Sequence, residues 1–249
     1  MDNVEQLNNE YWTKRSSSYG RQHYQELIDN LDKWSLYVKK NLSNRGSLRC
    51  LDVGTGPGFL AIVLSKLGHN VEAIDYNNQM LKQAKQNAAS FNAEVKFSKM
   101  SALDLQYLDD SFDVVVSRNL TWDLGQPKKA ISEWIRVLKP GGNFLNFDAN
   151  WYRYLNNYQA RQEYNLDRVN VSRSKQFDFY KETDIKTMES IAKDLPLTNI
   201  IRPDWDVEVL KQLNVTRVEV DSDINQEILT SGQQVNFAST PMFCVKVVK

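Results

Sequence analysis

Leu51-Asp52-Val53-Gly54-Thr55-Gly56-Pro57-Gly58-Phe59 is the stretch that decides the fold, because it joins a short apolar run to three glycines at alternate positions. The apolar run at residues 48–53 predicts a buried strand, and residues 59–67 predict a helix that Gly68 ends. Glycines between a strand and a helix let the chain turn tightly and let a ligand approach the backbone closely. The free amides at the start of such a helix favour an anionic group.

Strands and helices alternate on both sides of this stretch. Apolar spacing predicts further helices at residues 21–42, 79–90, 128–138 and 207–213, the first of them ended by Ser43-Asn44-Arg45-Gly46. Short apolar runs predict further strands at residues 71–75, 95–98, 112–117, 143–148, 217–220 and 242–248. The alternation predicts right-handed βαβ units, and therefore an α/β fold with a parallel sheet that helices cover on both faces.

The chain is predicted to form a single domain over residues 1–249, a length that suits one large core. Residues 1–45 are expected to be a helical cover, residues 48–148 the core, and residues 204–249 a return to the sheet. Residues 150–203 carry many polar and aromatic side chains and no convincing buried strand, so we interpret them as an inserted helical lid.

Composition argues against several classes of protein. Lys plus Arg and Asp plus Glu both number 31, and the zero net charge disfavours a protein that grips phosphate backbones. The acidic N-terminus is not a signal peptide, and the apolar stretches are far shorter than the roughly 20 residues of a membrane span. We therefore expect a cytoplasmic protein with no membrane partner. Cys50 and Cys244 are too few for a disulfide framework or a zinc site, and both are expected to be buried.

Asp75 ends the second predicted strand, 21 residues beyond Gly54. A carboxylate at that place in this fold accepts hydrogen bonds from a ribose diol, in dinucleotides and in S-adenosylmethionine alike. The dinucleotide fingerprint has a third glycine where this chain has Phe59, and Pro57 has no amide for a pyrophosphate. The pattern therefore favours a ligand with an amino-acid end. A nicotinamide dehydrogenase is the weaker alternative, as is a tight turn that binds no ligand.

Several motifs occur in the order and spacing of one known family. They are Leu51-Asp52-Val53-Gly54-Thr55-Gly56, Ile74-Asp75 with Met80, Met100-Ser101-Ala102-Leu103-Asp104-Leu105, Ser111-Phe112-Asp113-Val114-Val115, and Arg136-Val137-Leu138-Lys139-Pro140-Gly141-Gly142. With them, residues 48–148 resemble the class I S-adenosylmethionine-dependent methyltransferases, in the small-molecule branch that includes ubiquinone and menaquinone biosynthesis. The resemblance implies S-adenosylmethionine as cofactor. It also implies a Rossmann-like, seven-stranded, mostly parallel sheet with an antiparallel C-terminal strand.

The resemblance also implies a set of cofactor-binding residues. Asp75 would hold the ribose, Tyr76 and Met80 would flank the adenine, and Ser101 and Ala102 would contact its edge. The glycine loop, with Gly54, Thr55 and Gly56, would give contacts to the methionine part. Arg118 or Asn119, in the turn after the fourth strand, would contact the methionine amino group. Tyr19 or Arg15, in an N-terminal segment that resembles the family's cover, would reach the methionine carboxylate.

The resemblance implies transfer of a methyl group to an O, N or S atom of a small-molecule acceptor. The cofactor is already activated, so no catalytic residue is assigned, and no metal is expected. Asp123 and Asp148 are candidate acids near the acceptor, and His23 is a weaker candidate base. Arginines of the lid, among them Arg161 and Arg168, are candidates for an acidic acceptor, although a solvated face is the simpler reading.

Aromatic residues gather in the predicted lid, where they would either bind a flat or cationic acceptor or simply pack together. They are Trp151, Tyr152, Tyr154, Tyr158, Tyr164, Phe177, Phe179 and Tyr180. One alternative function is a regulatory protein that binds S-adenosylmethionine or S-adenosylhomocysteine without turnover. Another is an RNA or protein methyltransferase. The turn after the fourth strand lacks an Asn-Pro-Pro-Tyr motif, which disfavours a nucleobase acceptor. The sequence sets no oligomeric state.

Overall fold

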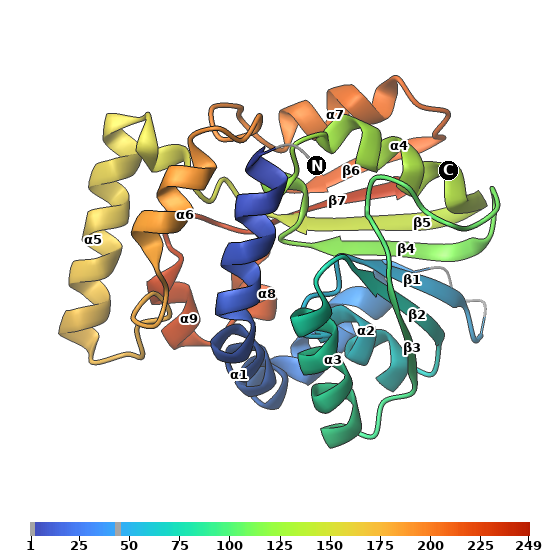
Figure 1. Ribbon diagram of the computed structural model, residues 1–249, viewed down its shortest axis with the longest axis horizontal. Helices are drawn as coiled ribbons and strands as arrows, with labels where there is room; N and C mark the ends of the chain where they lie inside the picture. The colour runs from blue at the N-terminus through green and yellow to red at the C-terminus, as the bar shows by residue number, and fades with distance from the viewer. Residues whose placement is uncertain (1–2, 43–45) are drawn as a thin grey trace.

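A mixed sheet forms the centre of the molecule in the computed structural model, which describes residues 3–42 and 46–249 (Figure 1). Within those residues the sheet has seven strands in the order β3-β2-β1-β4-β5-β7-β6. The strands are β1 Arg49–Val53, β2 Asn70–Asp75, β3 Val95–Lys99, β4 Phe112–Arg118, β5 Leu138–Asp148, β6 Arg217–Asp221 and β7 Phe243–Val248. Only β7 runs antiparallel to its neighbours β5 and β6 in this described sheet. The expected mostly parallel sheet with an antiparallel C-terminal strand is confirmed.

Helices cover both faces of the sheet. They are α1 Asn3–Lys40, α2 Phe59–Lys66, α3 Asn78–Ser90, α4 Pro127–Val137, α5 Tyr158–Ser174, α6 Ile185–Ala192, α7 Asp204–Lys211, α8 Asn225–Ile228 and α9 Ser231–Asn236, with short 3-10 turns η1 Thr121–Asp123 and η2 Arg153–Leu155. On one face, α1, α2 and α8 pack around the fully buried Trp34. On the other face, α4 and α7 pack around the fully buried Trp134. Figure 1 shows these two layers below and above the sheet.

Strand β4 shows why the sheet is covered twice. Its Val114 and Val116 belong to the core with Trp34, whereas Val115 belongs to the core with Trp134. Successive side chains of a strand point to opposite faces, so a continuous valine run needs apolar partners on both sides. Each buried valine contributes roughly 1.5–3 kcal/mol relative to exposure.

Gly58 allows α2 to start close against α3. Its φ is +90°, and a Cβ atom there would lie 3.2 Å from both the Cα and the Cβ of Ala84. A larger residue would meet backbone as well as side chain, so it would push the two helices apart. The glycine loop is therefore required for packing as well as for any ligand.

The predicted boundaries hold for the core but fail at three places. Helix α1 begins at Asn3, not at residue 21, and its first turns pack Tyr11 against residues of α6 and η1. Strand β5 begins at Leu138, not at residue 143, since Leu138 already pairs with Phe112 before the register shifts. Helices α8 and α9 were not predicted, being only four and six residues long. The predicted break at residues 43–45 lies outside the described residues.

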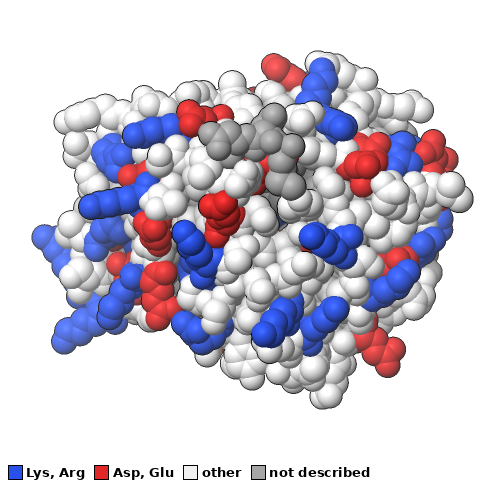
Figure 2. All heavy atoms as spheres, viewed as in Figure 1, with Lys and Arg blue, Asp and Glu red and all other residues white. Residues whose placement is uncertain are grey.

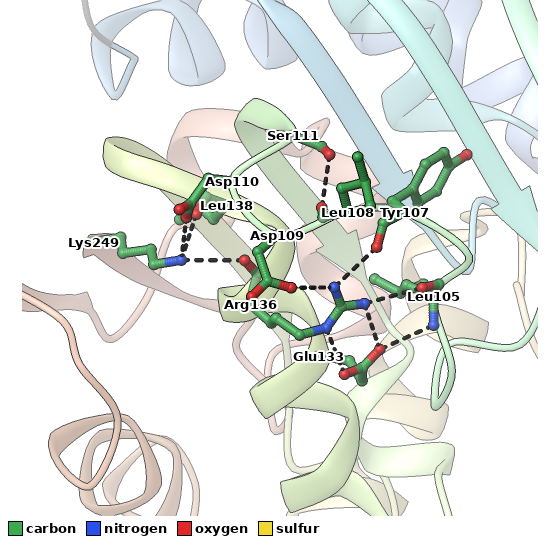
Figure 3. Close-up of polar contacts among 10 residues, drawn as sticks. All are labelled: Leu105, Tyr107, Leu108, Asp109, Asp110, Ser111, Glu133, Arg136, Leu138 and Lys249. Atoms are coloured by element: carbon green, nitrogen blue, oxygen red, sulfur yellow. Dashed lines mark hydrogen bonds and ion pairs between the residues drawn. The ribbon is translucent and has the colours of Figure 1, made fainter.

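Arg136 fastens the loop before β4 to helix α4 (Figure 3). Its guanidinium donates to the carbonyl oxygens of Leu105 and Tyr107 and to the carboxylates of Asp109 and Glu133, at 2.7–3.0 Å. Lys249 Nζ donates to the carbonyl oxygens of Arg136 and Leu138 and to Asp110. The Arg136 motif therefore has a structural role. It lies near the amino ends of β4 and β5, whereas the glycine loop lies at the carboxyl ends of the strands.

The segment 150–203 is helical and lies beyond the carboxyl ends of the strands. Helices α5 and α6 stand to the left of α1 in Figure 1, while the sheet lies to its right. Tyr154 stacks on Tyr164 at 4.3 Å between ring centroids, and Arg161 and Arg168 lie over these rings. Arg161 and Arg168 therefore serve packing within this segment. Both cysteines are buried and unbridged, as expected. Among the described residues, no helix is long and apolar enough to cross a membrane.

Candidate active site

A cavity of about 240 Å³, here called the first cavity, opens at the carboxyl ends of β1, β2 and β4 beneath α1. All of the residues predicted to bind the cofactor line it: Tyr19, Gly54, Thr55, Gly56, Asp75, Tyr76, Met80, Ser101, Ala102, Arg118 and Asn119. They come from six separate parts of the chain, which the parallel topology brings to one edge of the sheet. Arg15, the alternative to Tyr19, does not line this cavity.

The glycine loop is held in place by the carboxylate of Asp52. Asp52 Oδ2 accepts hydrogen bonds from the Thr55 hydroxyl at 2.6 Å and from the Ala61 amide at 3.0 Å, which joins the loop to the start of α2. Gly54 has a φ of +66°, and a Cβ there would approach Leu120 Cδ2 to 2.5 Å. Burial raises the pKa of Asp52 to about 7. The loop is thus preorganised by the protein itself.

Asp75 is the last residue of β2, and it faces the glycine loop. Its Oδ1 accepts from the Asn77 amide at 2.7 Å, and its Oδ2 accepts from the Gly56 amide at 2.9 Å. Burial raises the pKa of Asp75 to about 6, against the opposing effect of these two amides. Each carboxylate oxygen has a second lone pair, so both can accept a hydroxyl as well.

Helix α1 closes the first cavity through contacts that the sequence did not suggest. Asn77 Nδ2 donates to Asn9 Oδ1 at 2.9 Å and to Thr13 Oγ1 at 2.7 Å. Trp12 Nε1 donates to Asp123 Oδ2 at 2.6 Å, and burial raises the pKa of Asp123 to about 8. Asn77 has a local signal, since an Asn before a helical run is a typical N-cap. The pairing of Trp12 with Asp123 has none, because 111 residues separate them.

Arg118 does not suit the methionine amino group through its side chain, because a guanidinium only donates hydrogen bonds. Its Nη2 donates to Glu26 Oε1 at 2.6 Å, and its plane lies over Trp34 and Phe59. Asn119 is the better fit for an ammonium group, since its Oδ1 is buried without a partner among the described residues. Its φ of +55° lies in the left-handed region, which asparagine adopts more readily than most residues.

A second cavity of about 130 Å³ adjoins the first. The two share five lining residues: Trp12, Tyr19, His23, Arg118 and Asn119. Its lining includes Trp151, Tyr152, Phe179 and Tyr180 of the segment 150–203. Of the aromatic residues predicted to form a lid, the other four do not line it: Tyr154, Tyr158, Tyr164 and Phe177.

His23 lies where the two cavities meet. Its ring is 4.2 Å from that of Tyr19, and its Nδ1 is 3.8 Å from Glu26 Oε2. Burial, together with the positive charges of Arg118 and Arg15, holds the pKa of His23 well below 6.5. The imidazole is therefore neutral near pH 7, and its low pKa makes it only a weak proton acceptor.

Asp148 has a different place from the one expected beside an acceptor. It is fully buried and lines neither cavity. Its carboxylate binds Arg202 and accepts from the Trp122 amide and from Trp151 Nε1, each at 3.1 Å. Asp148 therefore positions the turn after β4 and does not face a ligand. Among the described residues, no group of His, Cys, Asp and Glu is arranged to hold a metal ion.

Comparison with known proteins gives concordant similarities. Residues 51–146 match the family model described as a methyltransferase domain. Over 130 residues the chain is 31% identical to a demethylmenaquinone methyltransferase of Clavibacter sepedonicus, with 52% of this chain and 53% of that protein covered. Over 103 residues it is 38% identical to a ubiquinone/menaquinone biosynthesis C-methyltransferase of Rickettsia peacockii, with 38% and 42% covered. The chain thus spans about half the length of these curated relatives.

Solved structures agree on the fold. A crystal structure from Methanococcus maripaludis, assigned to the S-adenosyl-L-methionine-dependent methyltransferases, superposes with a TM-score of 0.62 at 18% identity. The superposition covers 95% of this chain and 93% of that one. At this identity the similarity concerns the fold and not the acceptor.

Proposed function

We propose that the chain is a class I S-adenosylmethionine-dependent methyltransferase that transfers the cofactor's methyl group to a small molecule, because residues 51–146 match the model of a methyltransferase domain. The first cavity would hold S-adenosylmethionine and the second cavity the acceptor. The observation that carries the proposal is that the eleven residues implied by the sequence resemblance all line one cavity. The acceptor atom is proposed to be O, N or S. The names of the quinone-biosynthesis relatives add carbon as a fourth atom to test.

The charge of the first cavity supports this cofactor over a dinucleotide. The charged side chains that line it are Glu5, Asp52, Asp75, Asp123 and Arg118, so carboxylates outnumber cations. Arg118 is moreover paired with Glu26. A pyrophosphate would meet these carboxylates unfavourably, whereas a sulfonium and an ammonium group would be stabilised by them.

The residues of the first cavity divide between the parts of the cofactor. Asp75 would accept hydrogen bonds from both ribose hydroxyls, and Met80 and Tyr76 would flank the adenine. Asn119 Oδ1 would accept from the methionine ammonium. The loop amides near Gly54 would contact the rest of the methionine part. These roles follow from the donors and acceptors that each residue has left.

Methyl transfer then needs alignment more than acid–base chemistry. The acceptor atom must lie in line with the sulfur–methyl bond, and the shared wall between the cavities is where that line would cross. Tyr19 and His23 stand on this wall, and Trp12 of α1 covers it. His23 would receive the acceptor's proton where the acceptor carries one.

Calorimetric titration with S-adenosylhomocysteine tests the cofactor, and release of labelled methyl groups to a metabolite extract tests the transfer. We expect saturable binding and a labelled small molecule. No binding at millimolar ligand would refute the proposal. Binding without any turnover would favour the alternative of a regulatory protein, which is supported by the low basicity of His23.

An RNA acceptor is the less favoured reading. Figure 2 shows Lys and Arg interspersed with Asp and Glu over the displayed face, without a continuous basic track. Nucleic-acid binding relies on such a track to neutralise phosphates. Labelling of RNA, and not of small molecules, in the same extract experiment would reverse this preference.

A further inference from the structure

The second cavity carries an unbalanced positive charge. Its charged lining residues are Arg15, Glu26 and Arg118. Glu26 Oε1 lies 2.6 Å from Arg118 Nη2, so these two charges compensate each other. Arg15 has no carboxylate partner within residues 3–42 and 46–249. The second cavity therefore carries one net positive charge, whereas the adjoining first cavity is acidic.

Arg15 is held in a way that keeps its charge available. It is only 8% exposed, and it donates to Ser18 Oγ and, at 2.9 Å, to Gln22 Oε1. These neutral acceptors fix the guanidinium but do not compensate its charge. Burying a cation without a counter-ion is unfavourable, so a bound anion would offset the free-energy cost of the buried charge.

The helical spacing of α1 places this cation at the far side of the shared wall. Arg15, Tyr19, Gln22 and Glu26 recur every three or four residues and so share one face of the helix. Tyr19 lines both cavities, whereas Arg15 lines only the second one. The geometry therefore directs Arg15 to the acceptor and away from the cofactor's carboxylate.

Several of the residues that line the second cavity are aromatic. Trp122 and Tyr152 lie 5.1 Å apart between ring centroids, tilted by 34°, and Phe179 and Tyr180 continue the surface. Such a surface suits a flat ring, because rings pack face to edge or offset. The volume of about 130 Å³ limits the occupant to a small one.

We infer that the second cavity binds a small aromatic or heteroaromatic monocarboxylate, whose carboxylate pairs with Arg15 and whose ring lies against Trp122 and Tyr152. One uncompensated guanidinium matches a single negative charge and a bidentate carboxylate geometry. The inference rests on the proposed function, because it makes this molecule the methyl acceptor or a close analogue of it.

Benzoate and benzamide form the matched pair of probes, since they differ in charge but hardly in shape. They are titrated calorimetrically into the full chain saturated with S-adenosylhomocysteine. We expect benzoate to bind at least tenfold more tightly than benzamide. Arg15→Gln should abolish this preference, and Arg15→Lys should retain part of it. Arg21→Gln, on the exposed side of the same helix, is the control and should behave as the unchanged chain.

The cofactor carboxylate is the competing partner for Arg15. It is distinguished by comparing S-adenosylhomocysteine with methylthioadenosine, which lacks the amino-acid part. If Arg15→Gln weakens only the former, Arg15 serves the cofactor and the inference is overturned. Equal binding of benzoate and benzamide, or binding of neither, also overturns it. A failure of S-adenosylhomocysteine to bind the unchanged chain would instead refute the proposed function.

A purely structural role for Arg15 has its own signature. Because its charge is buried and uncompensated, Arg15→Gln should leave the melting temperature of the unliganded chain unchanged or raise it. A clear fall in that temperature, with the preference for benzoate retained, would make Arg15 structural and contradict the inference.

Discussion

The carboxylate of Asp75 can make the affinity for the cofactor depend on pH. Its raised pKa of about 6 means that the empty site begins to take up a proton just below neutral pH. Only the ionised form can accept hydrogen bonds from two hydroxyls at once. Asp52 and Asp123 face the same cavity with pKa values of about 7 and 8, so they also respond to a bound cation.

Affinity for S-adenosylhomocysteine should therefore fall as the pH drops through 6. Asp75 is about nine-tenths ionised at pH 7 and about one-tenth at pH 5, so the dissociation constant should rise about tenfold between them. Calorimetry at both values checks this. A dissociation constant that is the same at pH 5 and pH 7 would contradict it.

Replacing Asp75 by Asn tests the same contact without changing its size. We expect binding of S-adenosylhomocysteine to weaken by about 1.5–3 kcal/mol, the range for losing hydrogen bonds to a charged group. The pH dependence between 5 and 7 should shrink in this variant. Asp194→Asn, at an exposed position, is the control. Unchanged affinity in Asp75→Asn would remove the residue from the ribose.

The imidazole of His23 is a second residue whose environment can be measured. We expect its pKa, followed by NMR in the unliganded chain, to lie well below 6.5 and to rise in Arg15→Gln, because one of the two positive charges that lower it is gone. The same titration of His69, whose pKa is lowered by burial alone, is the internal control. If the pKa of His23 is the same in Arg15→Gln as in the unchanged chain, then Arg15 has no electrostatic effect on His23.

At the scale of elements, Asn77 fixes two helices at once. Its Oδ1 caps α3 by accepting from the amides of Gln79 and Met80, and its Nδ2 binds α1. Asn77→Ala should lower the free energy of unfolding by about 2–3 kcal/mol, of which the cap accounts for about 1 kcal/mol. Urea unfolding measures the loss.

Asn157→Ala is the matched control for Asn77→Ala. Asn157 caps α5 by accepting a hydrogen bond from the Ala160 amide. Asn157→Ala should therefore lower the free energy of unfolding only by the contribution of a helix cap. The difference between the two variants reports the contact between α1 and α3. Equal losses in both would show that this contact contributes nothing to stability.

The strands and helices of the core could be predicted because each carries its own local signal. Val114, Val115 and Val116 read as a buried strand, and Gly68 reads as the end of a helix. The first half of α1 could not, because Tyr11 packs on α6 and η1, which lie far away in sequence. Short helices such as α9 depend on a single capping box at Thr230, too small a signal for periodicity.

The first cavity could also be predicted in large part, because its residues lie within motifs. The second cavity could be predicted only in part. Four of its aromatic residues were expected near an acceptor, but the way that Arg15, Tyr152 and Phe237 meet from three distant segments was not. The role given to Arg15 illustrates the gap. It was predicted in an N-terminal segment over the cofactor, but neither its place on α1 nor the cavity that it lines could be read from the sequence.

At the scale of the whole molecule, Arg202 connects the segment 150–203 to the sheet. It is 3% exposed and binds Asp148 at the end of β5 and Asp206 of α7, with Nε 2.8 Å from Asp206 Oδ2. Asp148 in turn holds the turn after β4 through the Trp122 amide. Removing the cation would leave two carboxylates buried and unpaired.

Arg202→Met should therefore lower the free energy of unfolding by about 3–5 kcal/mol at pH 7. The loss should become smaller as the pH falls, because burial already raises the pKa of Asp148 and its protonated form needs no counter-ion. Urea unfolding at pH 7 and pH 5 measures both effects. Arg217→Met, at an exposed pair with Glu219, is the control. A loss that grows at pH 5 would contradict the assignment.

Helix α1 supplies residues to both cavities along one continuous rod of 38 residues, roughly 57 Å long at 1.5 Å per residue. Trp12, Tyr19 and His23 of this helix line both cavities, so a molecule bound in one cavity would contact side chains that also line the other. If the first molecule to enter strengthens the hold on the second, the second must strengthen the hold on the first by the same factor. Through helix α1, binding of the cofactor and binding of the acceptor would therefore be coupled reciprocally.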